Sequence, residues 1–328
     1  LDSDPDARSG AAGLIVHPAI SGLAAATPRR DVLRRMLGNL LFLLVLPVMP
    51  LFGGTPPNPA TRPVTGAVHA AASPGIRSPA AIVADLNTGR VLYSQEADQA
   101  RPVASLTKLM AALVLIESGL DLNASQTITK ADHRLVKQGA PSRLRSGCTY
   151  THRDLLHAAL MVSDNVATVA LGRSMGWTPE AFARRMTLRG AEMGLSHTRF
   201  TDPTGLDAGD VSTAREMLTI LRAVLNQPIL QSTCQKELYV VIPVGGKGHP
   251  ILYRHTDSYI RRHPWDILGA KTGYTHPAQY CLAIGAALDG RPIGMVFLGA
   301  IGDLTRFGDY SRVMRWLANQ SGPPAVTG

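Results

Sequence analysis

The chain has 328 residues, of which 45% are hydrophobic and 17% charged, and its formal net charge is +9. This is the composition of a globular protein, and the length allows one large or two modest domains. The basic balance favours an anionic environment, but the sequence contains no zinc-knuckle spacing, basic-aromatic cluster or RNA-binding signature, so nucleic acid is not indicated as a partner.

Residues 1–75 do not resemble a folded domain. Two pairs of arginines precede a short apolar run at 40–46, which is followed by small residues and is shorter than the roughly 20 residues of a membrane-spanning helix. This pattern is typical of a secretory signal, with an uncleaved N-terminal anchor as the alternative. We therefore predict an N-terminal extension, signal-like segment and linker over 1–75, a folded domain over 78–318 and a flexible tail over 319–328.

The folded part begins and ends with strand-like segments and has helical segments between them. This arrangement predicts an α+β fold in which a mainly antiparallel sheet is assembled from both ends of the domain and a helical lobe is inserted. In chain order we expect strands over 80–86 and 90–93, helices over 105–116, 154–161, 166–171, 179–194 and 213–225, strands over 238–244, 267–270, 279–288 and 292–300, and a helix over 304–317.

Three short polar motifs lie at unrelated positions in the chain. Ser105-x-x-Lys108 places a serine and a lysine about one turn apart on a helix whose following residues are apolar on every side. A lysine in low-dielectric surroundings loses its proton more easily, and the neutral amine can take the proton of a serine hydroxyl. Ser163-Asp164-Asn165 interrupts a predicted helix, and Lys271-Thr272-Gly273 follows a short predicted strand. Together, in this order, they indicate a serine acyl-transfer site.

On these three motifs the chain resembles the serine D-alanyl-D-alanine peptidases, which are the low-molecular-mass penicillin-binding proteins. The resemblance covers residues 78–318 and implies the fold shared by serine β-lactamases and D,D-peptidases. It implies no cofactor, peptidoglycan stem peptides as substrates, β-lactam antibiotics as covalent inhibitors, and a periplasmic or other cell-envelope location. A peripheral or N-terminal association with the membrane is a further expectation.

The chemistry of acyl transfer assigns a role to each residue type. We expect Ser105 to be the nucleophile at a helix N-terminus, Lys108 to be its base, and Ser163 to relay a proton to the leaving amine. The amide of Asn165 is expected to hold the substrate backbone and to support Lys108. Asp164 is interpreted as structural.

The third motif is expected to bind the substrate. Lys271 would add positive charge that keeps Lys108 neutral and attracts a carboxylate, to which Thr272 donates a hydrogen bond. Gly273 lets the strand edge approach the substrate closely. By the family resemblance, the backbone N–H groups of Ser105 and Tyr274 would stabilise the oxyanion.

Within the family, the sequence favours a peptidase over a β-lactamase. Glu180 and Glu192 lack the Glu-x-x-Leu-Asn context that a class A β-lactamase would show after its Ser-Asp-Asn motif. Several segments resemble the endopeptidase branch, and no extra β domain is expected after the final helix. These segments are Ser142–Gly147, Thr201–Leu206, Ser212–Glu216, and Lys271–Thr275 followed by Tyr280–Leu282. We therefore expect a D-alanyl-D-alanine endopeptidase that cuts peptidoglycan cross-links. A carboxypeptidase that removes the terminal D-alanine, and a non-catalytic cell-wall-binding protein of the same fold, are the alternatives.

Metal and disulfide chemistry have weak support in the sequence. The ten histidines show no metal-ligand spacing, so we expect surface or core roles for them and no metal site. One disulfide is conceivable among Cys148, Cys234 and Cys281, although Cys281 lies in a strand-like run and is expected to be a buried small hydrophobe.

Overall fold

The computed structural model describes residues 73–136, 138–257 and 265–320. The predicted signal-like segment lies outside these residues, as do most of the N-terminal extension and the end of the predicted tail. Among the residues described, none of the helices combines the length and the apolar character needed to cross a membrane. The domain boundaries inferred from the sequence remain predictions.

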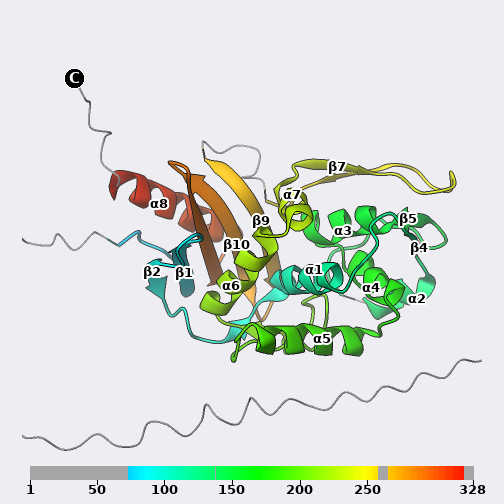
Figure 1. Cartoon of the computed structure of the whole chain (residues 1–328), viewed down its shortest axis with the longest axis horizontal. Coiled ribbons are helices and arrows are strands. Elements are labelled where there is room, and N and C mark those ends of the chain that lie inside the picture. The colour runs from blue at the N-terminus through cyan, green and yellow to red at the C-terminus, as the bar shows by residue number, and fades with distance from the viewer. Residues whose placement is uncertain (1–72, 137, 258–264, 321–328) are drawn as a thin grey trace, which may run out of the picture. The chain divides into compact units, whose positions relative to one another are not determined.

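A five-stranded antiparallel sheet combines the two ends of the folded part (Figure 1). Its strand order is β2-β1-β11-β10-β9, so the first strand of the domain pairs with the last, with Ala80 opposite Leu298. β10 and β11 are joined by a tight hairpin turn in which Asp289 and Gly290 both have positive φ, as a type I′ turn requires. The strands are β1 (Ala80–Asp85), β2 (Val91–Gln95), β9 (Asp266–Thr275), β10 (Gln279–Leu288) and β11 (Arg291–Ala300).

Helices cover both faces of this sheet. Every residue of β1 is buried, because alternate side chains enter two separate apolar cores. One core contains Val83 and Phe297 with α8 (Thr305–Gln320), and the other contains Ile82 and Val296 with α6 (Ala214–Leu225).

The helical lobe is built around α1 (Thr107–Glu117), which is buried on almost every side. α1 contacts α3, α4, α5 and α6, and this explains why its sequence is apolar all round instead of on one face. α7 packs against β9 and joins the lobe to the sheet. The other helices of the lobe are α2 (Lys130–Leu135), α3 (His152–Met161), α4 (Asn165–Ser174), α5 (Pro179–Glu192) and α7 (Pro228–Gln235).

Three two-stranded ribbons complete the described part of the chain. The β7–β8 ribbon runs alongside the helical lobe and α7 in Figure 1. Alternate residues of β7, such as Leu238 and Val240, lie on the exposed face of this ribbon. The ribbons pair β3 (Arg101–Pro102) with β6 (Val211–Ser212), β4 (Ser125–Thr127) with β5 (Thr149–Thr151), and β7 (Leu238–Val241) with β8 (Ile251–Arg254).

The predicted α+β architecture is confirmed, with local corrections. The strand predicted over 267–270 extends to Thr275, so the Lys271 motif lies inside a ten-residue strand and not beyond its end. The structure adds β8, α2 and α7, which the sequence analysis did not predict. A reciprocal capping box joins Thr129 and Asp132 at the start of α2.

Candidate active site

The first motif lies where the chain enters α1. Ser105 is in the 3₁₀ turn Ala104–Leu106, and α1 begins two residues later, so Lys108 is in its first turn. Ala104 has a φ of +48°, a left-handed conformation that is uncommon outside glycine and is typical of constrained functional turns. Lys108 is 1% exposed, and its Nζ is 3.0 Å from Ser105 Oγ.

Two further oxygen atoms contact the amine of Lys108. Nζ donates to Asn165 Oδ1 at 2.6 Å and to the backbone carbonyl of Thr204 at 2.5 Å. Both oxygens only accept hydrogen bonds, and a neutral amine has two N–H groups and one lone pair. When the two N–H groups satisfy Asn165 and Thr204, the lone pair is therefore left for the hydroxyl proton of Ser105. This arrangement suits a base for serine activation.

The pKa of Lys108 is lowered to about 8 from its ordinary value of 10.5. Burial is the main cause, because it disfavours the charged ammonium, and the negative charges of Asp202, Asp164 and Asp210 act in the opposite direction. The lysine can therefore lose its proton near neutral pH while these carboxylates keep the pKa from falling further.

A loop at residues 201–210 holds the first motif in place. Asp210 is fully buried and accepts hydrogen bonds from Thr107 Oγ1 at 2.9 Å and from the backbone N–H of Thr201 at 2.7 Å. Burial raises its pKa to about 7, although these donors act to lower it. Gly205 has a φ of +83°, and a Cβ there would lie 2.1 Å from the carbonyl oxygen of Ala104. The loop is therefore packed directly on the turn that carries Ser105.

Residues 201–206 resemble the endopeptidase branch in sequence, but no role in the site was predicted for them. The acceptor that this loop supplies is the main-chain oxygen of Thr204, which no side-chain pattern can reveal. Gly205 is a sequence feature that could have indicated this packing, because a glycine in a sharp loop often marks a place where two backbone segments approach closely.

The second motif occupies the break between α3 and α4. Ser163 has a φ of +58°, and Asp164 is the N-cap of α4, accepting from the backbone N–H of Ala167 at 3.0 Å. Ser142 Oγ also donates to Asp164, at 2.7 Å. The structural interpretation of Asp164 is consistent with this capping role. Because Asp164 caps the helix, the hydroxyl of Ser163 is left to interact with the third motif.

The third motif faces the other two from β9. Lys271 is fully buried, and its Nζ donates to Ser163 Oγ and to the carbonyl of Thr272 at 2.7 Å. Thr272 Oγ1 lies 2.8 Å from Thr256 Oγ1. A Cβ on Gly273 would lie 3.1 Å from the backbone nitrogen of Ser105, so the strand passes close to the nucleophile turn.

Tyr274 lies at the solvent-exposed end of the same strand. Its side chain is 51% exposed, and its ring centroid is 4.3 Å from that of Tyr280 on β10. The side chain therefore packs against a tilted ring of the neighbouring strand, and the expected contribution of this residue is from its main chain.

The two lysines influence one another. The pKa of Lys271 is lowered well below its ordinary value, first by burial and then by the positive charge of Lys108. Two buried ammonium groups in one site repel, so the site favours a state in which one of them is neutral. Two arrangements satisfy this condition. The one predicted from the sequence has a charged Lys271 and a neutral Lys108.

The structure brings together residues from three distant segments of the chain, as the sequence analysis expected. Ser105, Lys108 and Asn165 form one connected hydrogen-bonded group, and Ser163 and Lys271 form a second. Among the described residues no group of three or more His, Cys, Asp or Glu side chains could hold a metal ion. Cys148, Cys234 and Cys281 are all free and buried, so the conceivable disulfide is not formed in the structure.

Comparison with known proteins agrees with the geometry of the site. The family described as D-alanyl-D-alanine carboxypeptidase matches residues 67–302. The chain is 33% identical to a D-alanyl-D-alanine endopeptidase of Pseudomonas aeruginosa, over 86% of this chain and 88% of the relative. It is 32% identical to a D-alanyl-D-alanine endopeptidase of Escherichia coli, over 77% and 81%.

Solved structures show the same fold. The DD-transpeptidase of Streptomyces K15 superposes with a TM-score of 0.70 at 25% identity, covering 74% of this chain and 97% of that one. A D-alanyl-D-alanine carboxypeptidase of Mycobacterium tuberculosis gives a TM-score of 0.68 at 27% identity, covering 76% and 93%. The predicted D,D-peptidase-like fold is thereby confirmed. The chain belongs to the D-alanyl-D-alanine carboxypeptidase family and is a serine D-alanyl-D-alanine peptidase.

Proposed function

We propose that the protein is a D-alanyl-D-alanine endopeptidase that cleaves peptidoglycan cross-links through an acyl-enzyme on Ser105. One observation carries the catalytic part of the proposal. The amine of Lys108 lies 3.0 Å from Ser105 Oγ, while Asn165 and Thr204 supply acceptors for its two other hydrogen-bonding positions. The preference for endopeptidase is supported by the relatives of that name from Pseudomonas aeruginosa and Escherichia coli, which match over most of their length.

In the proposed acylation, Ser105 Oγ attacks the carbonyl carbon of the D-alanyl bond and its proton passes to Lys108 Nζ. The backbone N–H groups of Ser105 and Tyr274 stabilise the negative charge that develops on the carbonyl oxygen. When the carbon–nitrogen bond breaks, the proton reaches the leaving amine through the hydroxyl of Ser163. Water then attacks the ester, gives up a proton by the reverse route, and releases the acid and Ser105.

The remaining predicted residues bind the substrate in this proposal. The Asn165 side chain has its Oδ1 on Lys108, which leaves its Nδ2 to donate to a peptide carbonyl. Lys271 and Thr272 receive a carboxylate, and Gly273 lets the substrate backbone lie along β9. Penicillin would use the same groups, since its strained amide and its carboxylate occupy the positions of the D-alanyl bond and the carboxylate.

The place of the protein in the cell is part of the proposal. Peptidoglycan lies outside the cytoplasmic membrane, so a peptidase acting on it must be exported. The basic and apolar pattern within residues 1–75 supports a secretory signal or an N-terminal anchor. We propose a periplasmic location or another position in the cell envelope, with a peripheral or N-terminal association with the membrane.

A D-alanyl-D-alanine carboxypeptidase activity is the second candidate. It is favoured by relatives of that name, including one from Bacillus subtilis that is 30% identical and one from Mycobacterium tuberculosis that is 33% identical. Both reactions pass through the same acyl-enzyme, so they differ only in the leaving group.

Labelling with a fluorescent penicillin tests the shared chemistry. The wild type is expected to form a covalent adduct, and Ser105→Ala is expected to form none. A wild type that stays unlabelled, under conditions that label another member of the family, would contradict the enzymatic proposal and favour a non-catalytic binder. An adduct that persists on Ser105→Ala would show that another residue is the nucleophile.

Digestion of cross-linked and uncross-linked muropeptides separates the two activities. An endopeptidase removes dimers without releasing terminal D-alanine from monomers. Release of terminal D-alanine with dimers left intact would replace the endopeptidase assignment with the carboxypeptidase one.

A further inference from the structure

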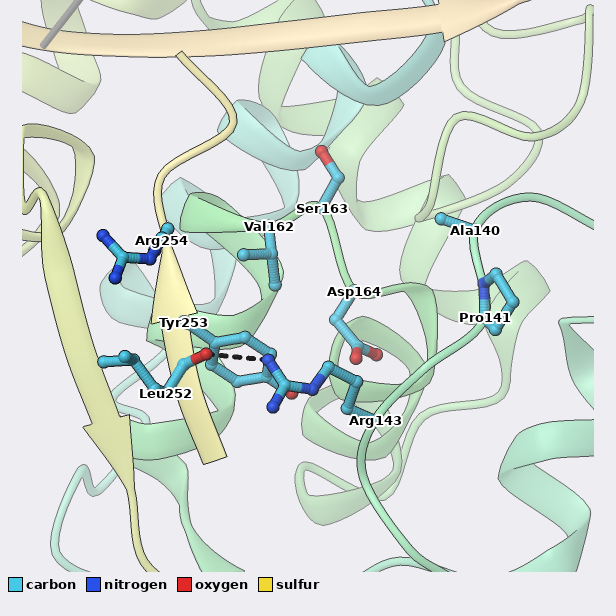
Figure 2. A pocket seen from close by; sticks show the side chains of 9 residues that line it. All are labelled: Ala140, Pro141, Arg143, Val162, Ser163, Asp164, Leu252, Tyr253 and Arg254. Carbon is cyan, nitrogen blue, oxygen red and sulfur yellow. Dashed lines mark hydrogen bonds between the residues drawn. The ribbon is translucent and has the colours of Figure 1, made fainter. Parts of the chain in front are cut away.

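A pocket of about 350 Å³ lies beside Ser163, on the side away from β9 (Figure 2). Its walls are the loop at 140–143, the turn at 162–164 and the strand β8. The mechanism proposed above uses Ser163 but no other residue of this pocket. A peptide that occupies the site next to Ser163 can therefore place another of its groups here.

Two arginines, Arg143 and Arg254, line the pocket, and contacts with the pocket wall fix the position of Arg143. Its Nη1 donates to the carbonyl of Leu252 at 2.7 Å, and its guanidinium carbon lies 5.5 Å from the centroid of the Tyr253 ring. These two contacts fix the guanidinium at the wall, as Figure 2 shows. Within the described part of the chain no carboxylate forms an ion pair with Arg143. The guanidinium has five N–H donors, so it retains capacity for a ligand.

Tyr253 forms the wall behind the guanidinium of Arg143. Its ring centroid lies 5.5 Å from the guanidinium carbon, and the residue is 2% exposed. The hydroxyl is buried and has no hydrogen-bond partner among the described residues, so it lies out of reach of a ligand in the pocket. Tyr253 therefore acts on the pocket through its ring, which positions Arg143.

Asp164 forms part of the opposite wall and is the group that would oppose an anion. Its two oxygens already accept hydrogen bonds from Ser142 Oγ and from the backbone N–H of Ala167. Burial also raises its pKa. The lining therefore offers a fixed guanidinium against a carboxylate whose two oxygens are already hydrogen-bonded.

We propose that this pocket is a subsite for a carboxylate of the peptide substrate that lies away from the cleaved bond, and that Arg143, held in place by the ring of Tyr253, recognises it. A carboxylate fits because its two oxygens can accept from two N–H groups of the planar guanidinium at the same time. This carboxylate is distinct from the one assigned to Lys271 and Thr272. The inference rests on the proposed function, since it adds a specificity determinant to the same catalytic site.

The test is a set of synthetic peptides in which the cleaved bond joins a D-alanine to the amine of a second peptide, as in a cross-link. Each peptide carries one carboxylate on a residue two, three or four positions before the cleaved bond, because the first position is the D-alanine itself, and each has a partner in which that carboxylate is a carboxamide. The ratio of kcat/KM for acid over amide is measured at each position. In the wild type we expect one position to favour the acid by about tenfold, as a charge-assisted hydrogen bond allows.

Variants assign this preference to the pocket. Arg143→Gln should bring the ratio close to one, whereas Arg143→Lys should keep part of it because the charge remains. Tyr253→Phe removes only the buried hydroxyl and keeps the ring, so it should leave the ratio near the wild-type value. Arg145→Gln is the matched control, because it removes an exposed positive charge from the same loop outside this pocket. It should leave the ratio unchanged.

Penicillin acylation of each variant separates this proposal from the function on which it rests. If the wild type is acylated but shows no acid preference at any position, the subsite is wrong and the peptidase assignment stands. An acid preference that survives Arg143→Gln, or that is lost equally in Arg145→Gln, also overturns the subsite. Absence of acylation in the wild type would instead overturn the proposed function.

Discussion

The two lysines of the site lie on opposite walls and have different surroundings. Lys108, on the helical wall, is near three carboxylates, whose charges raise its pKa against the effect of burial. Lys271 is on the strand wall, where the positive charges of Lys108 and Arg306 add to the effect of burial and lower its pKa further. Both side chains are buried, so the difference lies in their neighbours and not in their exposure.

This difference separates an acid–base role from a binding role. The carboxylates near Lys108 hold its pKa at about 8, where a proton can be accepted and returned within one catalytic cycle. No carboxylate is among the groups that act on Lys271 in the described part of the chain. A substrate carboxylate would supply the missing negative charge, so ligand binding and the charging of Lys271 would favour one another.

Replacing each lysine by methionine gives the largest expected effects. Lys108→Met removes the base and should lower the acylation rate constant by about 10²- to 10⁴-fold. Lys271→Met should instead act mainly through a higher KM for substrates that carry a carboxylate. Stopped-flow acylation and steady-state kinetics separate the two effects. Equal losses in the acylation rate constant for both variants would contradict the division of roles.

Gly205→Ala should disrupt the packing of the loop at residues 201–210 against the turn that carries Ser105. The added Cβ would meet the Ala104 carbonyl at 2.1 Å, in addition to the left-handed strain of about 1–2 kcal/mol. Gly147→Ala is the matched control, because its φ of +81° gives the same strain and no atom lies within 4 Å of the new Cβ. We expect Gly205→Ala to lose more unfolding free energy and more acylation rate than the control. Similar losses of unfolding free energy and acylation rate in both variants would show that the loop can move away from Ala104 without affecting the site.

Asp210→Asn should shift the pH dependence of acylation. The rate is expected to rise with pH as Lys108 loses its proton, with a midpoint near pH 8. The negative charge of Asp210 raises the pKa of Lys108, so its removal should move this midpoint to lower pH. Asparagine can still accept from Thr201 and donate to Thr107.

The exposed Asp207→Asn, in the same loop, should leave the midpoint in place. A shift in Asp207→Asn equal to that in Asp210→Asn would mean that the effect is not local to the buried contacts.

The thiols provide the smallest expected effect. Burial raises the pKa of Cys234 to about 12 and that of Cys281 to about 11, so both remain neutral at pH 8. A thiol reagent should therefore leave both unmodified in the folded protein and modify them after unfolding. Rapid modification of Cys234 in the folded state would indicate a thiolate beside Lys271, which would supply the anion that the strand wall otherwise lacks.

The chemistry of the site was predictable because it depends on residue types in three short motifs. Ser105, Ser163 and Lys271 were each assigned from the sequence, and the structure places them in one site. The sheet was also predictable at both ends of the domain, because buried strands and a two-residue turn leave local signals. The roles of these residues in catalysis remain predictions.

The surroundings of the motifs were not predictable, because they depend on contacts between distant segments. The carboxylate of Glu216, in the first turn of α6, accepts from Thr198 Oγ1 and from the N–H of His197, which lie in a separate segment of the chain. One wall of the pocket beside Ser163 is β8, which has only four residues and is therefore difficult to recognise as a strand from the sequence. Tertiary partners override local pattern at such positions.

The pairing of β1 with β11 has a consequence for the order in which the protein acquires its activity. β1 is made well before β11, yet the two strands pair directly in the same sheet. β9, which faces Ser105, reaches β1 only through β10 and β11. Contacts between such distant segments form late in folding. A nascent chain that ends before residue 291 therefore carries the reactive serine without the assembled strand wall, so the enzyme cannot cut anything until β11 has been made.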